Sequence, residues 1–208
     1  MDKTVLYHLS YGLYALGVND NGRKCGCIVN TVFQVTSTDP MIAVAVNRDN
    51  YTCEVIRRTG KFSVSILSEQ VNPNVIAALG FASGRDKDKF DGIGSGMVQD
   101  LPILSEGCCG YMICDVAAEA ETSTHIVFLA KVRDAFGNSG LPPMTYQYYH
   151  DVIKGKAPKN APTYVAEEPG SGYRCSVCGY RYEGDITQEP DSYVCPICGA
   201  PKTAFQLT

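Results

Sequence analysis

The sequence has no tryptophan, only three histidines and no excess of basic charge: 18 Lys and Arg stand against 22 Asp and Glu, for a net charge of −4. No cluster of Lys and Arg marks a phosphate-tracking surface, so no nucleic-acid partner is expected. No apolar run approaches the roughly 18 residues of a membrane span, so no membrane association is expected. The N-terminal stretch MDKTVLYHLSYGLY lacks the apolar core of a secretory signal, which predicts a cytoplasmic protein.

Several nucleotide-binding and hydrolase motifs are missing as well. There is no GxGxxG after a strand, no GxSxG, no HExxH and no Walker sequence, so a Rossmann dinucleotide site is not expected. Cysteine is abundant instead, with ten residues. Without an export signal, closely spaced CxxC pairs are more often metal ligands than disulfides. So many cysteines are also typical of an organism that avoids oxygen. The six outside such pairs are expected to be buried free thiols: Cys25, Cys27, Cys53, Cys108, Cys109 and Cys114.

Residues 10–150 have mainly the pattern of β-strands. Strands are predicted over 13–18, 28–37, 41–46, 61–67, 108–123 and 125–136, with a turn at 19–24. Helices are predicted over 51–60, which ends at a glycine, and over 71–81, which has Pro73 in its first turn. Many short strands with few helices favour an antiparallel barrel over a doubly wound sheet.

A change of composition divides the chain after residue 154. Residues 155–172 are rich in proline and glycine and have no amphipathic period, so they are predicted to be a linker. Residues 173–208 are then a separate unit, too short to fold on a hydrophobic core alone. The sequence therefore predicts a domain over 1–154, a linker and a small C-terminal domain that needs a metal.

Two CxxC pairs in the C-terminal unit supply that metal site: Cys175 with Cys178, and Cys195 with Cys198. Four thiolates in two tight turns form a tetrahedral site that suits zinc or iron, and the spacing does not decide between them. A glycine follows each pair, Gly179 and Gly199, and permits the positive φ that directs backbone N–H groups toward sulfur.

The sequence of the C-terminal unit resembles rubredoxin. CxxCGY at 175–180, CPxCG at 195–199 and a Lys-x-x-Phe segment at 202–205 are similar to the knuckles and closing segment of that family. The stretch between the knuckles is shorter than in a full-length rubredoxin, and Tyr193 stands where the family has tryptophan. The resemblance implies a rubredoxin-like domain that binds one iron through the four cysteines, with zinc as the alternative.

The larger domain resembles the flavin reductase-like family of FMN-binding split barrels in three segments: 25–67, LGFASGRDKDKF at 79–90 and THIVFLAKV at 124–132. The resemblance implies a mainly β fold, bound FMN and NAD(P)H as electron donor. The implied FMN-binding residues line the flavin ring and hold its phosphate: Asn30, Thr31, Val32, Asn47, Arg48, Asn50, Thr52, Ser83, Gly84 and Lys89.

His125 is the catalytic candidate, because the matching histidine of the family lies near the flavin and the nicotinamide. Thr124 precedes it in place of the family's acidic residue. The segment TYQYYH at 145–150 resembles the aromatic C-terminal strand of that family and is expected to approach the flavin. A packed, purely structural histidine is the alternative for His125.

Together the two domains resemble the high-molecular-weight rubredoxins of anaerobic microbes. This resemblance implies an NAD(P)H-dependent homodimer that passes single electrons from FMN to the iron and on to a flavodiiron oxygen or nitric oxide reductase. Two alternatives stay open. One is a flavin or ferric reductase in which the tail is accessory, and the other is a non-enzymatic FMN-binding module with a structural zinc ribbon.

Overall fold

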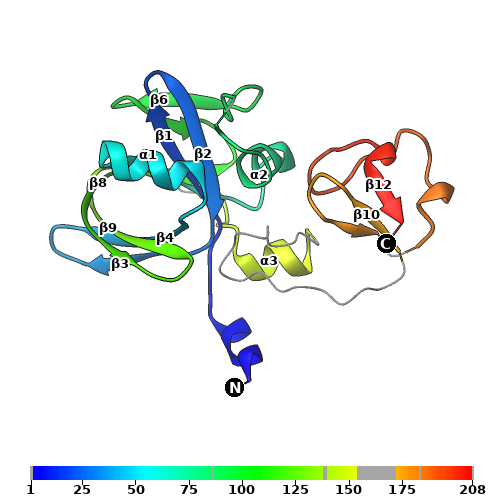
Figure 1. The fold of residues 1–208 in the computed structure, drawn as a ribbon, viewed down its shortest axis with the longest axis horizontal. Coiled ribbons are helices and arrows are strands. Elements are labelled where there is room, and N and C mark those ends of the chain that lie inside the picture. Colours follow the sequence, from blue (N-terminus) through cyan, green and yellow to red (C-terminus); the bar gives the residue numbers. More distant parts are fainter. Residues whose placement is uncertain (1, 86, 138–139, 154–171, 183, 208) are drawn as a thin grey trace.

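The computed structural model describes residues 2–85, 87–137, 140–153, 172–182 and 184–207. These residues form a larger, mainly β domain and a small C-terminal domain (Figure 1). The predicted linker 155–172 lies outside the described residues, apart from Gly172. The larger domain contains, in chain order, η1 (Lys3–His8), β1 (Tyr14–Asp20), β2 (Arg23–Val29), β3 (Val32–Thr36), β4 (Met41–Asn47), α1 (Tyr51–Thr59), β5 (Lys61–Leu67), α2 (Pro73–Gly80), β6 (Ser95–Val98), β7 (Leu101–Leu104), β8 (Cys108–Glu121), β9 (His125–Gly137) and α3 (Tyr146–Asp151).

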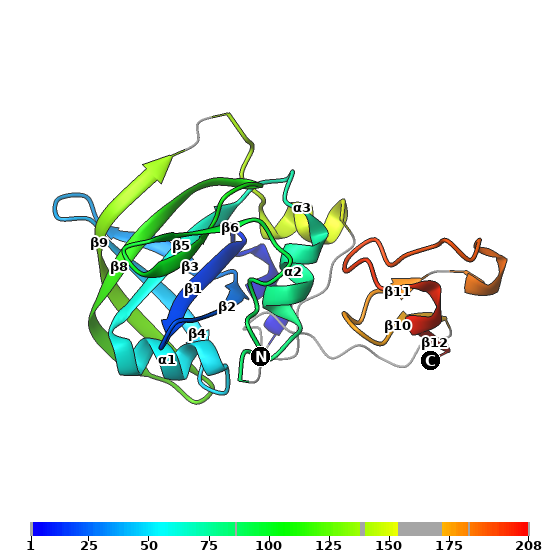
Figure 2. The same cartoon turned by 90° about the horizontal axis from the view of Figure 1, so that it is seen from above.

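Seven of the described strands form one antiparallel sheet in the order β2-β1-β5-β8-β9-β4-β3. The sheet is strongly curved, and the long strands β8 and β9 wrap around its core (Figure 2). The strands β2 and β3 are the two edges, although only Asn30 and Thr31 separate them in the chain. The hairpin β6–β7 pairs separately. The predicted antiparallel barrel is therefore confirmed.

Local sequence signals explain the helix α1. Cys53, Val55 and Ile56 are buried on its inner face. Arg57 and Arg58 lie in its last turn, where positive charges interact favourably with the negative end of the helix dipole. It ends at Gly60, which adopts a left-handed φ of 69° while its N–H donates to the carbonyl of Ile56. The helix begins directly after the turn that follows β4, which places its N-terminus beside the end of that strand.

The structure corrects three expectations. The apolar run 28–37 is not one strand, because the chain turns at Asn30 and Thr31 and returns as β3 against β4. The predicted turn 19–24 shrinks to Asn21 and Gly22, whose positive φ angles of 53° and 93° allow a two-residue hairpin. The segment 145–150 is the helix α3 rather than a strand, since the Thr145 side chain caps it by accepting from the N–H of Tyr148.

The C-terminal domain is built from short elements. They are β10 (Tyr173–Cys175), β11 (Arg181–Tyr182), η2 (Ile186–Gln188), η3 (Lys202–Ala204) and β12 (Phe205–Leu207). The strands pair in the order β11-β10-β12. Among the described residues, none of the helices of either domain combines the length and the apolar composition that a bilayer crossing requires.

Candidate metal centre and flavin-binding region

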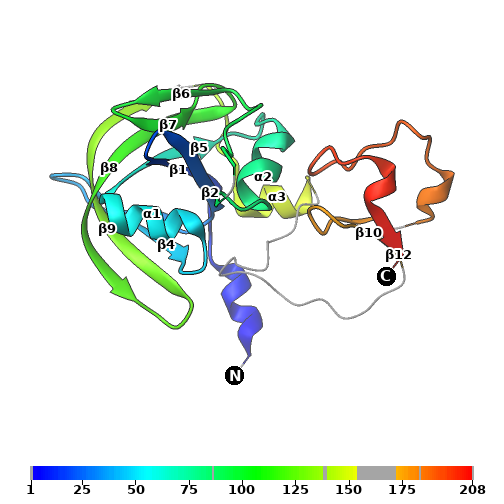
Figure 3. The same cartoon turned by 45° about the horizontal axis from the view of Figure 1, so that its top comes forward.

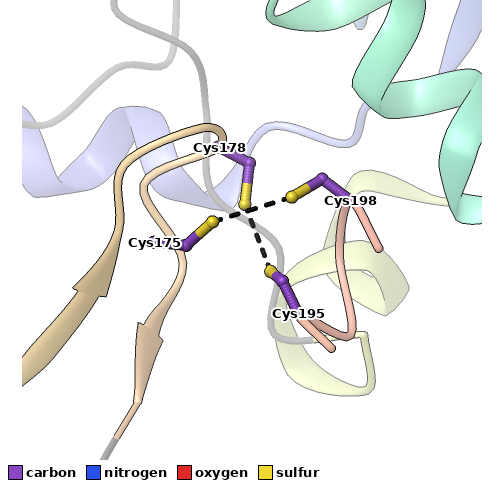
Figure 4. Close-up of side chains that lie close together, drawn as sticks. All are labelled: Cys175, Cys178, Cys195 and Cys198. Atoms are coloured by element: carbon purple, nitrogen blue, oxygen red, sulfur yellow. Dashed lines mark hydrogen bonds between the residues drawn. The ribbon is translucent and has the colours of Figure 1, made fainter. Parts of the chain in front are cut away.

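The four cysteines of the two CxxC pairs converge in the C-terminal domain (Figure 4). All four are buried, and their Sγ atoms lie within 4.8 Å of one another. The Sγ atoms of Cys175 and Cys198 are 3.7 Å apart, and those of Cys178 and Cys195 are 3.5 Å apart. Metal–sulfur bonds of about 2.3 Å in a tetrahedron place sulfur atoms roughly 3.8 Å apart. The cysteine cluster therefore has the size of a tetrahedral metal site.

The two knuckles have the same backbone geometry. In the first, Gly179 has φ 80° and its N–H donates to the Cys175 carbonyl over 2.9 Å. In the second, Gly199 has φ 67° and its N–H donates to the Cys195 carbonyl over 2.8 Å. Only glycine adopts these left-handed angles without strain, which is why a glycine follows each pair.

The geometry of the second knuckle favours a thiolate. The pKa of Cys195 is lowered, first by the hydrogen bond from the Cys178 thiol and then by the backbone N–H groups of Ile197 and Cys198, against the opposing effect of burial. Hydrogen bonds of this kind stabilise the charged form of sulfur, which is the form that binds metal. The donor set, its spacing and this electrostatic environment all fit a metal ion held by four thiolates.

An aromatic cluster encloses the sulfur atoms. Phe205 lies at ring-centroid distances of 6.3 Å from Tyr180, 6.5 Å from Tyr182 and 5.8 Å from Tyr193, in edge-to-face arrangements. Tyr193, in the place of the family's tryptophan, is part of this cluster. Lys202 donates to the carbonyls of Thr187 and Glu189. The Lys-x-x-Phe segment thus closes the domain, with Phe205 packed inside and Lys202 tying down the loop between the knuckles.

The larger domain brings four of the predicted FMN-binding residues into one buried region. Thr52 is the second residue of α1, and its hydroxyl lies 3.9 Å from the Sγ of Cys25. Gly84 is packed so closely on Cys25 that a Cβ there would lie 2.1 Å from its Sγ and 3.2 Å from the Cδ of Lys89. Burial raises the pKa of Cys27, which lies on the same strand as Cys25, and the side chain of Asn50 is among the groups that oppose this rise. We call this group around the N-terminus of α1 the α1 corner.

Lys89 gives the α1 corner its charge. The residue is only 5% exposed, and its ammonium donates to the Leu79 carbonyl over 2.6 Å. Burial lowers the pKa of Lys89, and the nearby thiols of Cys27 and Cys25 oppose this effect. A buried ammonium is costly unless an anion compensates it, and the first turn of a helix also favours an anion. The corner therefore fits a phosphate group such as that of FMN. Ser83 is exposed at its rim and accepts from the N–H of Arg85.

The remaining predicted residues lie around the end of β4. The carbonyl of Thr31 accepts from the N–H of Ala45 over 3.2 Å, and Val32 pairs with Val44, so the turn that holds the buried Asn30 lies against this strand. Because β4 runs directly into the turn before α1, this region adjoins the α1 corner.

His125 begins β9 opposite Asn47, the last residue of β4. Its Nδ1 lies 2.8 Å from the hydroxyl of Thr124. The guanidinium of Arg48 donates to the carbonyl of Thr122, and its backbone N–H donates to that of Thr124. Arg48 therefore fastens the β8–β9 turn in this structure and does not point its charge at the α1 corner.

Sequence reasoning missed the strand residues that line the α1 corner, Cys25 and Cys27, which it treated as inert buried thiols. It also missed the neighbouring cluster on Tyr51, whose ring has the Arg23 and Arg85 guanidiniums 5.4 and 5.0 Å from its centroid. The one available signal was the i, i+2 spacing of the cysteines, which places both on one face of a strand.

Comparisons with known proteins agree with both sites. The family model described as "Flavin reductase like domain" matches residues 6–155, and "Rubrerythrin, rubredoxin-like domain" matches residues 173–206. The chain is 37% identical to the high molecular weight rubredoxin of Moorella thermoacetica, with 99% of each chain covered. It is 35% identical to the ferric-chelate reductase (NAD(P)H) of Archaeoglobus fulgidus, over 79% of this chain and 98% of that protein.

Solved structures share the fold of the larger domain. Flavoredoxin from Methanosarcina acetivorans superposes with a TM-score of 0.57 at 24% identity, over 62% of this chain and 70% of that one. An FMN-binding protein from Thermus thermophilus superposes with a TM-score of 0.61 at 19% identity, over 67% and 83%. The larger domain is therefore a flavin reductase-like FMN-binding split barrel, and the four cysteines form a rubredoxin-like iron site. The chain belongs to the family of high-molecular-weight rubredoxins, in which these two domains are fused for electron transfer.

Proposed function

We propose that this electron-transfer protein oxidises NADH or NADPH and delivers the electrons singly to an acceptor protein. The observation that carries the proposal is the presence in one chain of a corner with a buried ammonium, that of Lys89, and a cluster of four cysteines that fits a metal. FMN, when bound, accepts the two electrons of a hydride and releases them one at a time. Iron held by four thiolates exchanges one electron, so the second domain suits the single-electron outlet.

The residues of the α1 corner bind the cofactor phosphate in this proposal. The ammonium of Lys89 neutralises charge, while the Thr52 hydroxyl and the first N–H groups of α1 donate hydrogen bonds. Gly84 lets its loop lie directly against β2, because a side chain at this position would collide with Cys25. Asn50 and Ser83 complete the group of donors.

Asn30, Thr31 and Val32 are proposed to line the flavin ring, because their turn lies against β4 and leads into the edge strand β3. His125 is proposed to face the nicotinamide. The hydroxyl of Thr124 holds its Nδ1, a role that the family's acidic residue would fill with a full charge. A neutral partner orients the imidazole without the electrostatic stabilisation of the imidazolium that a carboxylate gives.

A homodimer is proposed on the basis of the edge strand β3. Phe33 is 62% exposed and Val35 is 47% exposed on this strand, which has a free edge within the described sheet. Apolar side chains on an unpaired edge favour a protein interface. A flavodiiron-type protein is proposed as the electron acceptor, on the strength of the family alone.

A ferric or flavin reductase is the second candidate function. The relative from Archaeoglobus fulgidus that is named a ferric-chelate reductase aligns with 79% of this chain, which supports an activity of the larger domain on its own. In that case the iron domain would be accessory.

An anaerobic reduction experiment separates these functions. The protein as purified, with its own bound metal and with FMN added to saturation, is analysed for iron and zinc and titrated with NADH and in parallel with NADPH while its visible spectrum is recorded. The proposal predicts that the yellow flavin and the red iron absorption are bleached together. Iron that stays oxidised while the flavin is reduced favours the second candidate. A colourless tail with stoichiometric zinc refutes the electron-transfer proposal and supports a zinc ribbon.

A further inference from the structure

The two knuckles of the iron domain differ in exposure although their backbones match. The residue between the cysteines is Val177 in the first knuckle and Ile197 in the second. Val177 is 51% exposed, whereas Ile197 is 1% exposed. Equivalent positions on a free domain would both face water, so a partner must cover the second knuckle.

The helix α2 of the larger domain supplies part of the cover. Ala77 and Phe81 pack against the apolar cluster that contains Ile197. Asn74 lies on the same face, three and seven residues before them, and its Oδ1 would be 3.0 Å from a Cβ built on Gly199. The opposite face of α2 buries Val75 and Leu79 in the larger domain. The helix is therefore placed between the two domains (Figure 3).

The segment around α3 completes the cover. Ile153 and Phe81 pack both against the core of the larger domain and against the cluster of the iron domain. Tyr149, on the same segment, is 2% exposed. Its pKa is raised, chiefly by this burial. In Figure 4, Cys198 lies on the side of the cluster that faces α2, while Cys178 and Cys175 come from the opposite turn.

We propose that the two knuckles have different partners: the second docks the iron domain on the α2–α3 surface of the flavin domain, and the first is the face at which a soluble acceptor protein reaches the iron. The α2–α3 surface is formed by Asn74, Ala77, Phe81 and Ile153. The docking half stands on the contacts just described, while the acceptor half rests on the proposed function. Discharge then needs no undocking, because the docked domain leaves Val177 open.

A matched pair of variants tests the docking half. Ile197→Glu and Val177→Glu place the same charge at equivalent positions of the two knuckles. Ala77→Glu disturbs the same interface from the side of the flavin domain and leaves the sequence of the iron domain unchanged. Unchanged iron content and visible absorption show that each variant keeps its metal site. Amide hydrogen exchange is then measured on the oxidised, iron- and FMN-loaded chain with no reductant present.

We expect exchange in α2 and α3 to rise by at least about tenfold in Ile197→Glu and Ala77→Glu, and to stay at the wild-type level in Val177→Glu. Unchanged exchange in the first two variants overturns the docking, as does an equal rise in Val177→Glu. This readout needs no electron transfer, so it can fail while the proposed function holds, and the reverse.

A second measurement tests the acceptor half. The iron is reduced with one equivalent of dithionite electrons and mixed with ferricytochrome c as the probe, so that each ferrous site loses one electron and each cytochrome gains one. We expect Val177→Glu to change the rate by roughly tenfold, and Leu207→Glu, which places the same charge at a residue that is 74% exposed on β12, to leave it within about twofold of wild type. A rate that Val177→Glu leaves at the wild-type level overturns this half.

Discussion

Replacing Asp20 by Asn removes a carboxylate that three side chains of the flavin domain share. Its Oδ2 accepts from the Tyr51 hydroxyl and from Arg23, each over 2.6 Å, and its Oδ1 accepts from Arg58 over 2.6 Å. The side chain is only 10% exposed. These bonds, from Tyr51, Arg23 and Arg58 in that order, lower the pKa of Asp20 from 3.8 to about 2.

This pKa gives the size of the expected effect. A carboxyl group whose pKa falls from 3.8 to about 2 on folding contributes up to about 2 kcal/mol at neutral pH. Because the folded-state pKa is the lower one, the contribution is complete above about pH 5 and is lost as the pH falls through 3.8 toward 2. At pH 3 about half of it remains.

Urea unfolding followed by circular dichroism measures this effect at pH 7, 5 and 3. We expect Asp20→Asn to lower the free energy of unfolding of the flavin domain by about 2 kcal/mol at pH 7 and 5, and by about 1 kcal/mol at pH 3. The exposed Asp91→Asn is the control and should change little at any pH. A difference from wild type that is absent at pH 7, or that does not shrink at pH 3, would refute the reasoning.

Three further predictions concern the two cofactor sites. Lys89→Met should weaken FMN binding by about tenfold to a hundredfold in a fluorescence titration, because a charge-assisted hydrogen bond is lost, whereas the exposed Lys87→Met should not. Phe205→Ala should cost the iron domain about 3–5 kcal/mol, seen as loss of iron absorption at a lower temperature, and an unchanged temperature would contradict its place in the core. Cys198→Ala should abolish the iron absorption and expose residues 173–207 to protease while the circular dichroism of the barrel persists; a protease-resistant tail would show that the metal is not its staple.

Features that depend on short sequence separation were predicted well. The helix α1 follows from its apolar spacing and its stop at Gly60, and the cysteine site follows from two turns that each place their ligands locally. The α1 corner was reached only through the family resemblance. Thr52, Gly84 and Lys89 meet because the barrel folds distant segments together, and no periodicity records that meeting.

The errors have equally specific causes. The run 28–37 contains Asn30 between apolar residues, and β-propensity does not show that the chain reverses there. The strand expected at 145–150 followed from the family resemblance, whereas the capping side chain of Thr145 and the packing of Tyr149 favour a helix. The docking surface was outside sequence reasoning, because Ala77 and Phe81 look like ordinary residues of an amphipathic helix until a second domain covers them.

The burial of the six remaining cysteines bears on how the correct iron site is loaded. Burial raises the pKa of every one of these thiols, to about 11 for Cys27 and Cys53 and about 12 for Cys114. A protonated thiol is a poor metal ligand, so at neutral pH these groups do not compete for incoming iron once the barrel has folded. Within the described residues, the four ligand cysteines differ from the barrel thiols in that their Sγ atoms converge within 4.8 Å of one another. A chain with ten cysteines can thereby bind one iron at one site, because that site alone offers four sulfur atoms in a tetrahedral arrangement.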